Sequence, residues 1–434
     1  MTDESGYPSR PYAWTVVAIL IATAILSYTD RQVLSLLVDP IRADLGISDT
    51  QISLLLGTAF AVVYGFAGIP LGFLADRTSR RNLIFGGVLV WSIGTLACGF
   101  SRSFGELFAA RIVVGLGEAV LSPAAISLIS DYFPPSRRGT AVGCFLSGIA
   151  MGIGASILIG GGVLRLVESG ALAGTALAAQ PAWRLVLLVI GAPGVLWALA
   201  ILAIREPARR MTETNVTTAQ TAETTGWSRV IPIYIVVALA SLVDNAVGAW
   251  APTLLIREFT RNAAQVGVVL GLLLTAGFGG GVLIGGWLAD RAGARGGWSS
   301  KLVVALISSL LILPVSLLVN AGQYNVVLLS VPLYFALSGS VTALGFSAIL
   351  DVVPNRSRGL AMAISFFLNV AIGAGVGPTA VAMASDRLFG ANAGLGPAIT
   401  LTVALSYGLA AITLLATLSL FRRRDGTQCF QAPR

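Results

Sequence analysis

Long apolar segments recur along the whole chain and are separated by short polar stretches. A helix needs about 20 apolar residues, at a rise of 1.5 Å each, to cross the hydrocarbon core of a membrane. Segments of this kind begin near Trp14, Gln51, Leu83, Leu107, Thr140, Arg184, Val230, Gln265, Leu302, Val326, Gly359 and Ile399. The pattern therefore predicts an all-α membrane protein with twelve transmembrane helices.

A ten-residue motif occurs twice, each time just after a long apolar segment. GFLADRTSRR begins at Gly72 and GWLADRAGAR begins at Gly286, 214 residues later. Asp30, deep in the first apolar segment, has a counterpart at the same spacing in Asp244. The repeat predicts two pseudo-symmetric six-helix bundles, an arrangement typical of transporters that rock about a central site.

A charged, threonine-rich stretch marks the boundary between the two halves. It reads REPARRMTETNVTTAQTAETTGWS, and Pro207 within it would end the preceding helix. A polar tract of this composition buries too little apolar surface to fold alone. We therefore predict a cytoplasmic amino terminus (1–13), a first bundle (14–204), a cytoplasmic linker (205–228), a second bundle (229–421) and a cytoplasmic tail (422–434).

Composition and charge exclude a water-soluble protein. Of the 434 residues, 56% are hydrophobic and 11% charged, whereas about 25% of a soluble protein is charged. The formal charge is +8, and most of the 28 Lys and Arg residues lie at the termini and in loops after even-numbered helices. The positive-inside rule then places both termini in the cytoplasm. We expect an integral protein of a bacterial inner membrane, in contact with membrane lipids and not with nucleic acid.

Signatures of an enzyme or of an ATP-driven pump are absent from the sequence. The chain has no histidine, and its three cysteines lack metal-ligand spacing. It also has no Walker loop for an ATP-driven pump. We therefore expect no enzyme, catalytic residue, cofactor or metal site, and any proton coupling must use carboxylates.

The paired loops and the twelve segments resemble the major facilitator superfamily over essentially the whole chain. Within that superfamily, SYTDRQVLS around Tyr28 to Arg31 and RIVVGLGEAVLSPAAISLISDYF from Arg111 to Phe133 resemble the spinster-like transporters. That family carries lysolipids and sphingoid phosphates in animals. A similar first-helix pattern occurs in the anion and cation symporter family, which moves small organic acids. Either resemblance implies alternating access around a cavity lined by helices one, four, seven and ten.

The fifth helix departs from the pattern of drug antiporters in the same superfamily. Their glycines are spaced around a Gly-Pro pair, and here Ser156 and Ile157 replace that pair. The sequence therefore leaves symport and antiport both open.

A few charged residues lie inside the predicted membrane helices, where each costs on the order of 3 kcal/mol. They are Asp30 and Arg31 on the first helix and Arg111 and Glu118 on the fourth. We hypothesise that Arg31 lies between Asp30 and Glu118 and contacts an anionic substrate head. Protonation of either carboxylate would weaken its hold on Arg31 and so couple a proton to binding. The alternative is a permanent ion pair that ties two helices together.

The second half repeats this pattern with less charge. Asp244 and Asn245 on the seventh helix mirror Asp30 and Arg31, but the positive charge is lost. Asp244 is a candidate second proton site, or a hydrogen-bonded packing residue left from the duplication. Candidate substrate contacts are Arg31, Arg111, Glu118 and Asn245, together with the aromatic residues Tyr28, Tyr64, Trp250 and Tyr334.

Charged residues in the loops after even-numbered helices are candidates for gating. In this superfamily the first such loop latches the halves when the site opens outward. The candidates here are Asp76, Arg77, Arg81, Asp131, Arg138, Asp290, Arg291, Asp351 and Arg358.

These features predict a monomeric, proton-coupled secondary transporter of an amphiphilic organic anion, with a lysolipid or sphingoid phosphate as candidate. One alternative is a proton-coupled symporter of a small organic carboxylate. A second alternative, from a different class, is a membrane receptor that binds a ligand without moving it.

Overall fold

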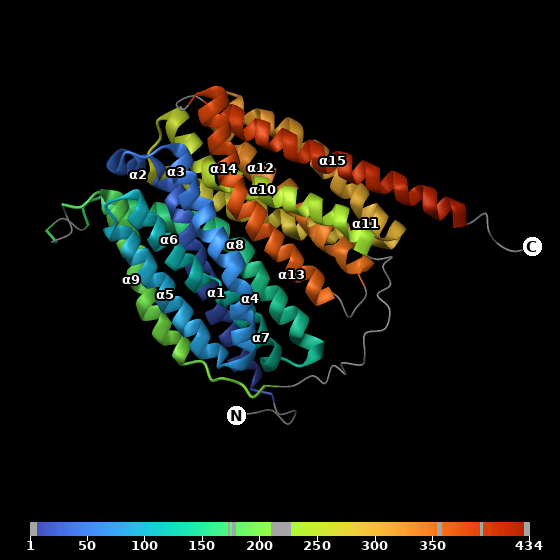
Figure 1. The fold of residues 1–434 in the computed structure, drawn as a ribbon, viewed down its shortest axis with the longest axis horizontal. Helices are drawn as coiled ribbons and strands as arrows, with labels where there is room; N and C mark the ends of the chain where they lie inside the picture. Colours follow the sequence, from blue (N-terminus) through green and yellow to red (C-terminus); the bar gives the residue numbers. More distant parts are fainter. Residues whose placement is uncertain are drawn as a thin grey trace, which may run out of the picture. The chain divides into compact units, whose positions relative to one another are not determined.

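A computed structural model describes residues 7–171, 174–175, 179–209, 227–353, 358–390 and 394–428. Within these ranges, all the secondary-structure elements that span several residues are helices (Figure 1). Those of the first half are α1 (Arg10–Gln32), η1 (Val33–Leu36), α2 (Val38–Leu45), α3 (Asp49–Ser53), η2 (Leu54–Thr58), α4 (Ala59–Arg77), α5 (Arg80–Phe100), α6 (Phe104–Glu118), α7 (Leu121–Tyr132), α8 (Pro135–Glu168) and α9 (Ala182–Leu202).

The second half is also built of helices. Its elements are α10 (Trp227–Phe259), α11 (Ala263–Leu317), η3 (Leu318–Asn320), α12 (Tyr324–Val352), α13 (Arg358–Leu368), η5 (Asn369–Ala374), α14 (Gly375–Ala384), η6 (Ser385–Phe389) and α15 (Leu395–Gln428). The long α11 reverses at Gly297, whose φ of 65° suits a residue without a side chain. The described helices are thus consistent with the twelve predicted spans, because α11 contains two of them and the 34-residue α8 is long enough for another.

The side chains that cover these helices are apolar on the outside as well as inside. Phe66, Leu196 and Leu283 are 81%, 71% and 74% exposed. Among the described residues, ten stretches are long and apolar enough to cross a membrane, and the one at Ala263–Asn320 contains both arms of α11. Large apolar residues in such numbers on a surface are what a lipid environment requires.

The chain divides into two compact units. The first contains Met1–Val216 and Gly248–Thr275, and the second contains Thr217–Val247 and Ala276–Arg434. The units therefore differ from the two predicted bundles in one respect, because the end of α10 and the start of α11 group with the first half.

Glycines explain why the start of α11 belongs to the first unit. A Cβ atom at Gly161 of α8 would lie 2.7 Å from the Val268 nitrogen, and one at Gly271 would lie 2.4 Å from the Leu158 nitrogen. Two helix backbones approach this closely only where neither carries a side chain. Glycines on both helices thus allow α8 and α11 to touch backbone to backbone.

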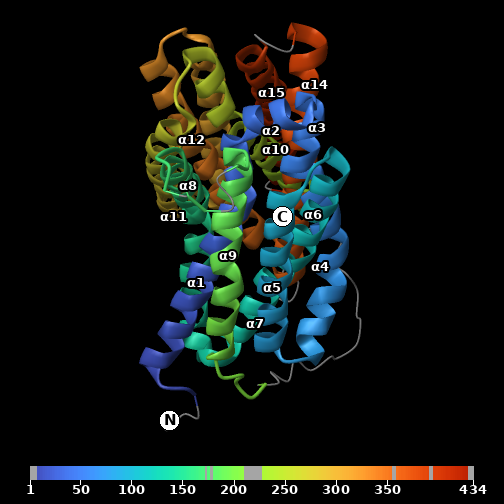
Figure 2. The ribbon, with the colours of Figure 1, turned by 90° about the vertical axis from the view of Figure 1, so that its left-hand side faces the viewer.

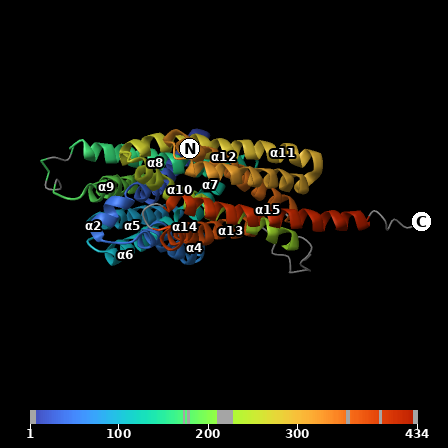
Figure 3. The same ribbon diagram turned by 90° about the horizontal axis from the view of Figure 1, so that it is seen from above.

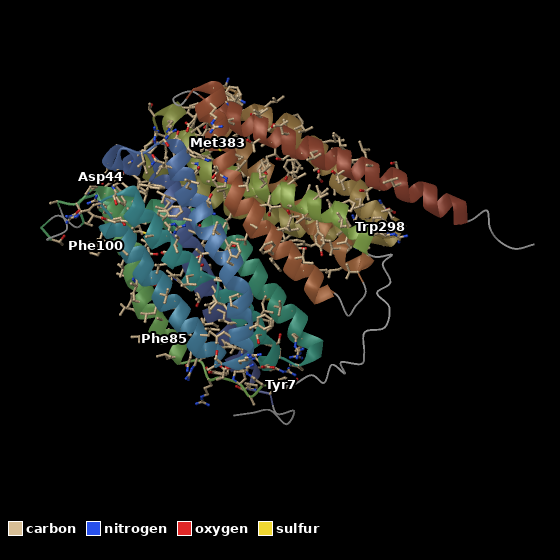
Figure 4. The ribbon with its side chains drawn as sticks, in the orientation of Figure 1. Tyr7, Asp44, Phe85, Phe100, Trp298 and Met383 are labelled. Atoms are coloured by element: carbon tan, nitrogen blue, oxygen red, sulfur yellow. The ribbon has the colours of Figure 1, made fainter. Side chains whose placement is uncertain are left out.

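Within the first unit, α5 packs along α9, and α1 packs along α8 (Figure 2). Asp44 and Phe100 lie at one end of this unit and Tyr7 at the other (Figure 4). We call these the Asp44 end and the Tyr7 end. The topology prediction assigns the Tyr7 end to the cytoplasm.

Within the second unit, α11 and α12 run side by side (Figure 3). Their contact is again made through glycine, since a Cβ atom at Gly281 would lie 2.3 Å from the Ala336 carbonyl oxygen. Trp298 marks the reversal of α11, where the Arg229 guanidinium lies 6.0 Å from its ring.

Candidate functional site

Helix ends inside the first unit carry the charged residues of the candidate site. The α-helical pattern of α1 ends at Gln32 and tightens into the 3-10 turn η1, so Asp30 and Arg31 lie in the last turn of α1. Glu118 is the last residue of α6, and α7 begins three residues later with Pro123 in its first turn. Helix interruptions of this kind free backbone groups and commonly mark functional positions.

Arg31 and Glu118 form an ion pair. Nη2 of Arg31 lies 2.5 Å from Oε2 of Glu118, and the Glu118 side chain is fully buried while the Arg31 side chain is 15% exposed. A bond between a guanidinium and a carboxylate is a strong one, since both partners are charged. The pair joins α1 to α6 across the first unit.

Aromatic rings cover the Arg31 guanidinium. Its Cζ atom lies 3.8 Å from the centre of the Phe60 ring, 4.7 Å from that of Tyr28 and 6.0 Å from that of Tyr64. Cations are attracted to ring faces within about 6 Å. Tyr28 and Tyr64, both predicted to contact substrate, therefore lie around the predicted anion contact.

The structure corrects the predicted order of the three charges. The Asp30 residue is 1% exposed, and in the described part of the chain no ion pair joins its carboxylate to Arg31. The carboxylate lies near Glu118, Arg111 and the Thr95 hydroxyl. Adjacent helix residues point about 100° apart, so the Asp30 and Arg31 side chains leave α1 in different directions and Arg31 does not lie between the two carboxylates.

Arg111 lies behind this pair and is 1% exposed. Its guanidinium donates to the backbone carbonyls of Leu55, at 3.2 Å, and of Asp30, at 3.4 Å. The structure therefore places Arg111 against the backbone of the site, away from a position that a substrate could reach directly.

Several buried polar atoms here lack a hydrogen-bond partner among the described residues. They are Oδ1 of Asp30, Nε of Arg31, Nη2 of Arg111 and Oε1 of Glu118. Buried polar atoms without partners are rare and concentrate where groups change protonation or bind ligands. Each of the four charged residues thus keeps one unused bonding position.

A second polar cluster occupies the second unit. Tyr334 and Ser338 donate to the same oxygen of Asp244, Oδ1, over 2.8 and 2.5 Å. The Tyr407 hydroxyl in turn donates to Ser338 over 2.7 Å. Asp244 and Tyr334 were both candidates, whereas the sequence did not single out Ser338 or Tyr407.

The two other candidates on α10 are turned toward protein groups. Asn245 donates to the Ser241 carbonyl over 2.9 Å. Trp250 has no exposed surface and belongs to the first unit.

Four charged residues that the sequence did not single out meet at the Asp44 end, and we call them the α2 ion cluster. They are Asp39 and Arg42 of α2, Asp49 of α3 and Arg257 of α10. Arg257 binds both oxygens of Asp49, over 2.7 and 2.8 Å, and Oδ1 of Asp39 over 2.7 Å. Arg42 Nε lies 3.1 Å from Oδ1 of Asp49. The one sequence signal for this cluster is that Asp39 and Asp49 each lie in the first turn of a helix.

Arg80 organises the Tyr7 end of the first unit. Its guanidinium is 2% exposed and forms ion pairs with Asp131 and, over 2.8 Å, with Glu206. The predicted gate residue Asp131 therefore contacts Arg80. Arg81 enters the same cluster through its backbone, whose N–H donates to Glu206 over 2.8 Å.

Glu206 shows that the predicted linker begins as part of the first unit. It accepts hydrogen bonds from Ser79, Arg80 and the Arg81 backbone at the start of α5. Burial raises the pKa of the Glu206 carboxyl, but these donors outweigh it and the net pKa lies below the ordinary value. A carboxylate at a helix amino terminus is stabilised in this way.

The remaining gate candidates are scattered. In the second unit, Asp351 pairs with Lys301 over 2.5 Å. Asp290 is exposed, and the exposed Arg291 lies over the Trp287 ring at 4.0 Å. Arg77 is exposed, and Arg138 is half-buried. The side chains of Asp76 and Arg358 lie outside the described part of the structure.

Comparisons with known proteins agree with this fold and with the paired loops. The sequence profile of the Major Facilitator Superfamily matches residues 20–378. A relative from Mycolicibacterium smegmatis named "MFS-type efflux pump" is 31% identical over 433 residues, covering 97% of this chain and 96% of its own. The hexuronate transporter of Bacillus subtilis is 26% identical, covering 86% of this chain and 88% of its own.

A solved structure of a related protein has the same fold. A bacterial homologue of the human lysosomal transporter Spinster, in an inward-facing and occupied conformation, is 27% identical to this chain. It superimposes with a TM-score of 0.76 and covers 96% of this chain and 98% of its own. This protein is thus an integral membrane transporter and not an enzyme. It belongs to the major facilitator superfamily and is a spinster-like member of it.

Proposed function

We propose that this transporter couples protons to the movement of an amphiphilic organic anion by alternating access, with Arg31 binding the anionic head. A lysolipid or a sphingoid phosphate is the substrate class that the spinster-like similarity favours. The observation that carries the proposal is the Arg31–Glu118 ion pair, in which the acid is fully buried and the base is partly exposed. Of the two charges, only the guanidinium offers a surface to a ligand.

The geometry around Arg31 suits a phosphate or carboxylate. The guanidinium has five N–H donors in a plane and binds such groups through two parallel bonds. Its Nε has no partner among the described residues. The Phe60 and Tyr28 rings lie against the face of the Arg31 guanidinium, so the edge of the guanidinium is left for an anion.

Charge balance links binding to a proton. The Arg31–Glu118 pair is neutral, so an added monoanion would leave one uncompensated negative charge in a medium of low dielectric constant. Protonation of Glu118 removes that charge and frees Arg31 for the anion. Asp30, equally buried and with an unpartnered oxygen, is the second candidate proton acceptor. Proton and anion therefore bind best together.

Alternating access needs contacts that close each end of the transport path in turn. We assign this role to the α2 ion cluster at the Asp44 end and to the Arg80 cluster, with Asp131 and Glu206, at the Tyr7 end. The candidates Asp76, Arg77, Asp290 and Asp351 remain part of the proposal as gating residues.

A small organic carboxylate is the second candidate substrate. The Asp244 cluster favours it, because a carboxylate held by Tyr334 and Ser338 can recognise hydroxyl groups of a compact polar ligand. The hexuronate transporter among the relatives handles an anion of that kind. In this reading Arg31 keeps its role as the anion contact.

The test is transport by the purified protein in proteoliposomes, with and without an imposed pH gradient. The probes are a radiolabelled lysophospholipid, a sphingoid phosphate and a hexuronate, and Arg31→Ala vesicles serve as the control. We expect movement of one of the two lipids that responds to the gradient and is lost in the control. Hexuronate movement alone would establish the small-carboxylate alternative. Binding of a probe without movement in any condition would indicate the receptor alternative.

A further inference from the structure

Asp49 is bound by two arginines, although one of them already binds both of its oxygens. Its side chain is fully buried. Arg257 already binds both of its oxygens, over 2.7 and 2.8 Å. Arg42 adds a third contact, from Nε to Oδ1 over 3.1 Å. Asp39, which Arg257 also binds, balances the second positive charge, but its side chain is 39% exposed and so needs a counterion less than the buried Asp49 does.

The two arginines reach Asp49 from different parts of the chain. Arg42 belongs to α2, which is joined to α3 by three residues, and its Nε also bonds the Ile47 carbonyl between them. Arg257 is 208 residues away from Asp49. It lies in the part of α10 that belongs to the first unit, whereas the residues of the same helix up to Val247 belong to the second. Arg42 is therefore fixed beside Asp49 by the local chain, whereas Arg257 is not.

We propose that Arg42 is a standby partner of Asp49, meaning that Arg42 neutralises the buried Asp49 carboxylate when Arg257 moves away from it. This inference rests on the alternating access proposed above, since opening the Asp44 end requires Arg257 to separate from α2 and α3. A buried carboxylate stripped of its partner is strongly unfavourable. A second arginine held by the local backbone lowers that cost and so makes opening possible.

The sign of the effect follows from comparing the two states. In the closed state, Arg42 contributes little to Asp49, because Arg257 already satisfies both oxygens and its positive charge repels Arg42. In the open state, Arg42 is the counterion that remains. Removing Arg42 therefore disfavours the open state more than the closed one. If Arg42 only helped to lock the closed state, removing it would have the opposite effect.

Pulsed electron paramagnetic resonance on the full-length protein in nanodiscs measures this directly. Spin labels are placed at Ala43 of α2 and Glu258 of α10, two exposed positions on either side of the cluster. The native cysteines are replaced first. The fraction of label pairs at the longer distance reports opening, without any need for the substrate to be known.

We expect Arg257→Gln to raise the open fraction and Arg42→Gln to lower it by about tenfold, the scale of one hydrogen bond to a charged group. Asp49→Asn removes the charge that needs a partner, so adding Arg42→Gln to it should change nothing further. Arg184→Gln is the matched control. It breaks the ion pair between α9 and Asp44 of α2, over 2.8 Å, and should leave the open fraction unchanged.

The outcomes separate this inference from the proposed function. An open fraction that rises in Arg42→Gln would overturn the standby role and make Arg42 part of the lock. An equal fall in Arg184→Gln would also overturn it, because the effect would then come from a loosened α2. If Arg257→Gln itself leaves the distances unchanged, the Asp44 end does not open by losing Arg257, and alternating access at this end fails along with the inference.

Discussion

Arg31 and Glu118 form an ion pair between two helices, and only Arg31 is accessible to a ligand. The Arg31 side chain is 15% exposed, whereas that of Glu118 has no exposed surface. Glu118 can therefore influence a ligand only through Arg31, by holding or releasing it. The pair has the layout of an anion contact with a protonatable group behind it.

Replacing Arg31 tests the anion contact. We expect Arg31→Ala to abolish binding of the transported probe while the protein still folds, because the anion loses its only partly exposed guanidinium partner at this site. Arg31→Lys keeps the charge but loses the planar fork, so it should retain weak binding. The measurement is equilibrium binding of labelled probe to purified protein, with thermal unfolding as the check on folding. Normal binding by Arg31→Ala would remove the residue from the site.

Replacing the two buried carboxylates tests the proton coupling. Glu118→Gln and Asp30→Asn each mimic the protonated form, so some binding should remain while the dependence on a pH gradient is lost. Transport into proteoliposomes with and without the gradient gives the answer. If both variants respond to the gradient as the parent does, the coupling group lies elsewhere.

Asp244 offers a contrast within the same assay. An amide at this position can still accept hydrogen bonds from Tyr334 and Ser338 through its oxygen. We therefore expect Asp244→Asn to fold and to keep its response to the gradient. Loss of that response in Asp244→Asn alone would move the coupling from the first unit to the second.

Much of this architecture could be predicted from the sequence because membrane helices leave a strong apolar signal and the repeat marks the two halves. The charged residues of the site could be found for the same reason, since a charge among apolar residues stands out. The contacts among these charged residues could not be predicted. Asp30 and Arg31 are neighbours in the sequence, but helix geometry points their side chains in different directions, so Arg31 pairs with Glu118 of α6 and Asp30 does not pair with Arg31.

The ion clusters at the two ends escaped prediction for other reasons. Arg257 and Asp49 lie 208 residues apart, and no spacing rule links them. Glu206 lies in a polar stretch whose composition indicates a tether, and composition does not reveal that its first residues cap α5. In both cases the contact is made by tertiary packing, which a local pattern does not record.

Asp131 and Asp351 provide a test of how burial sets the strength of an ion pair. Asp131 is 11% exposed beside an Arg80 that is 2% exposed, whereas Asp351 is 39% exposed beside Lys301. We expect Asp131→Asn to destabilise the protein by roughly 2–3 kcal/mol, because it leaves Arg80 partly unpaired. Asp351→Asn should cost less, about 1 kcal/mol, because Asp351 is half-exposed and the buried Lys301 keeps its bond to Ser347. Thermal unfolding in detergent compares the two, and equal midpoints would contradict this ranking.

Glu206 makes a prediction about pH. Because its pKa is lowered in the folded protein, its stabilising effect is complete above the unfolded value of about 4.3. It is lost as the pH falls through the lower folded value. Glu206→Gln should therefore lower the midpoint of thermal unfolding at pH 7, and the difference from the parent should shrink in acid.

The matched control is Arg81→Ala, since Arg81 contacts Glu206 only through its backbone N–H among the bonds described. It should unfold like the parent at every pH, and a deficit in Glu206→Gln that stays constant down to pH 3 would show that the charge of Glu206 is not what stabilises this end.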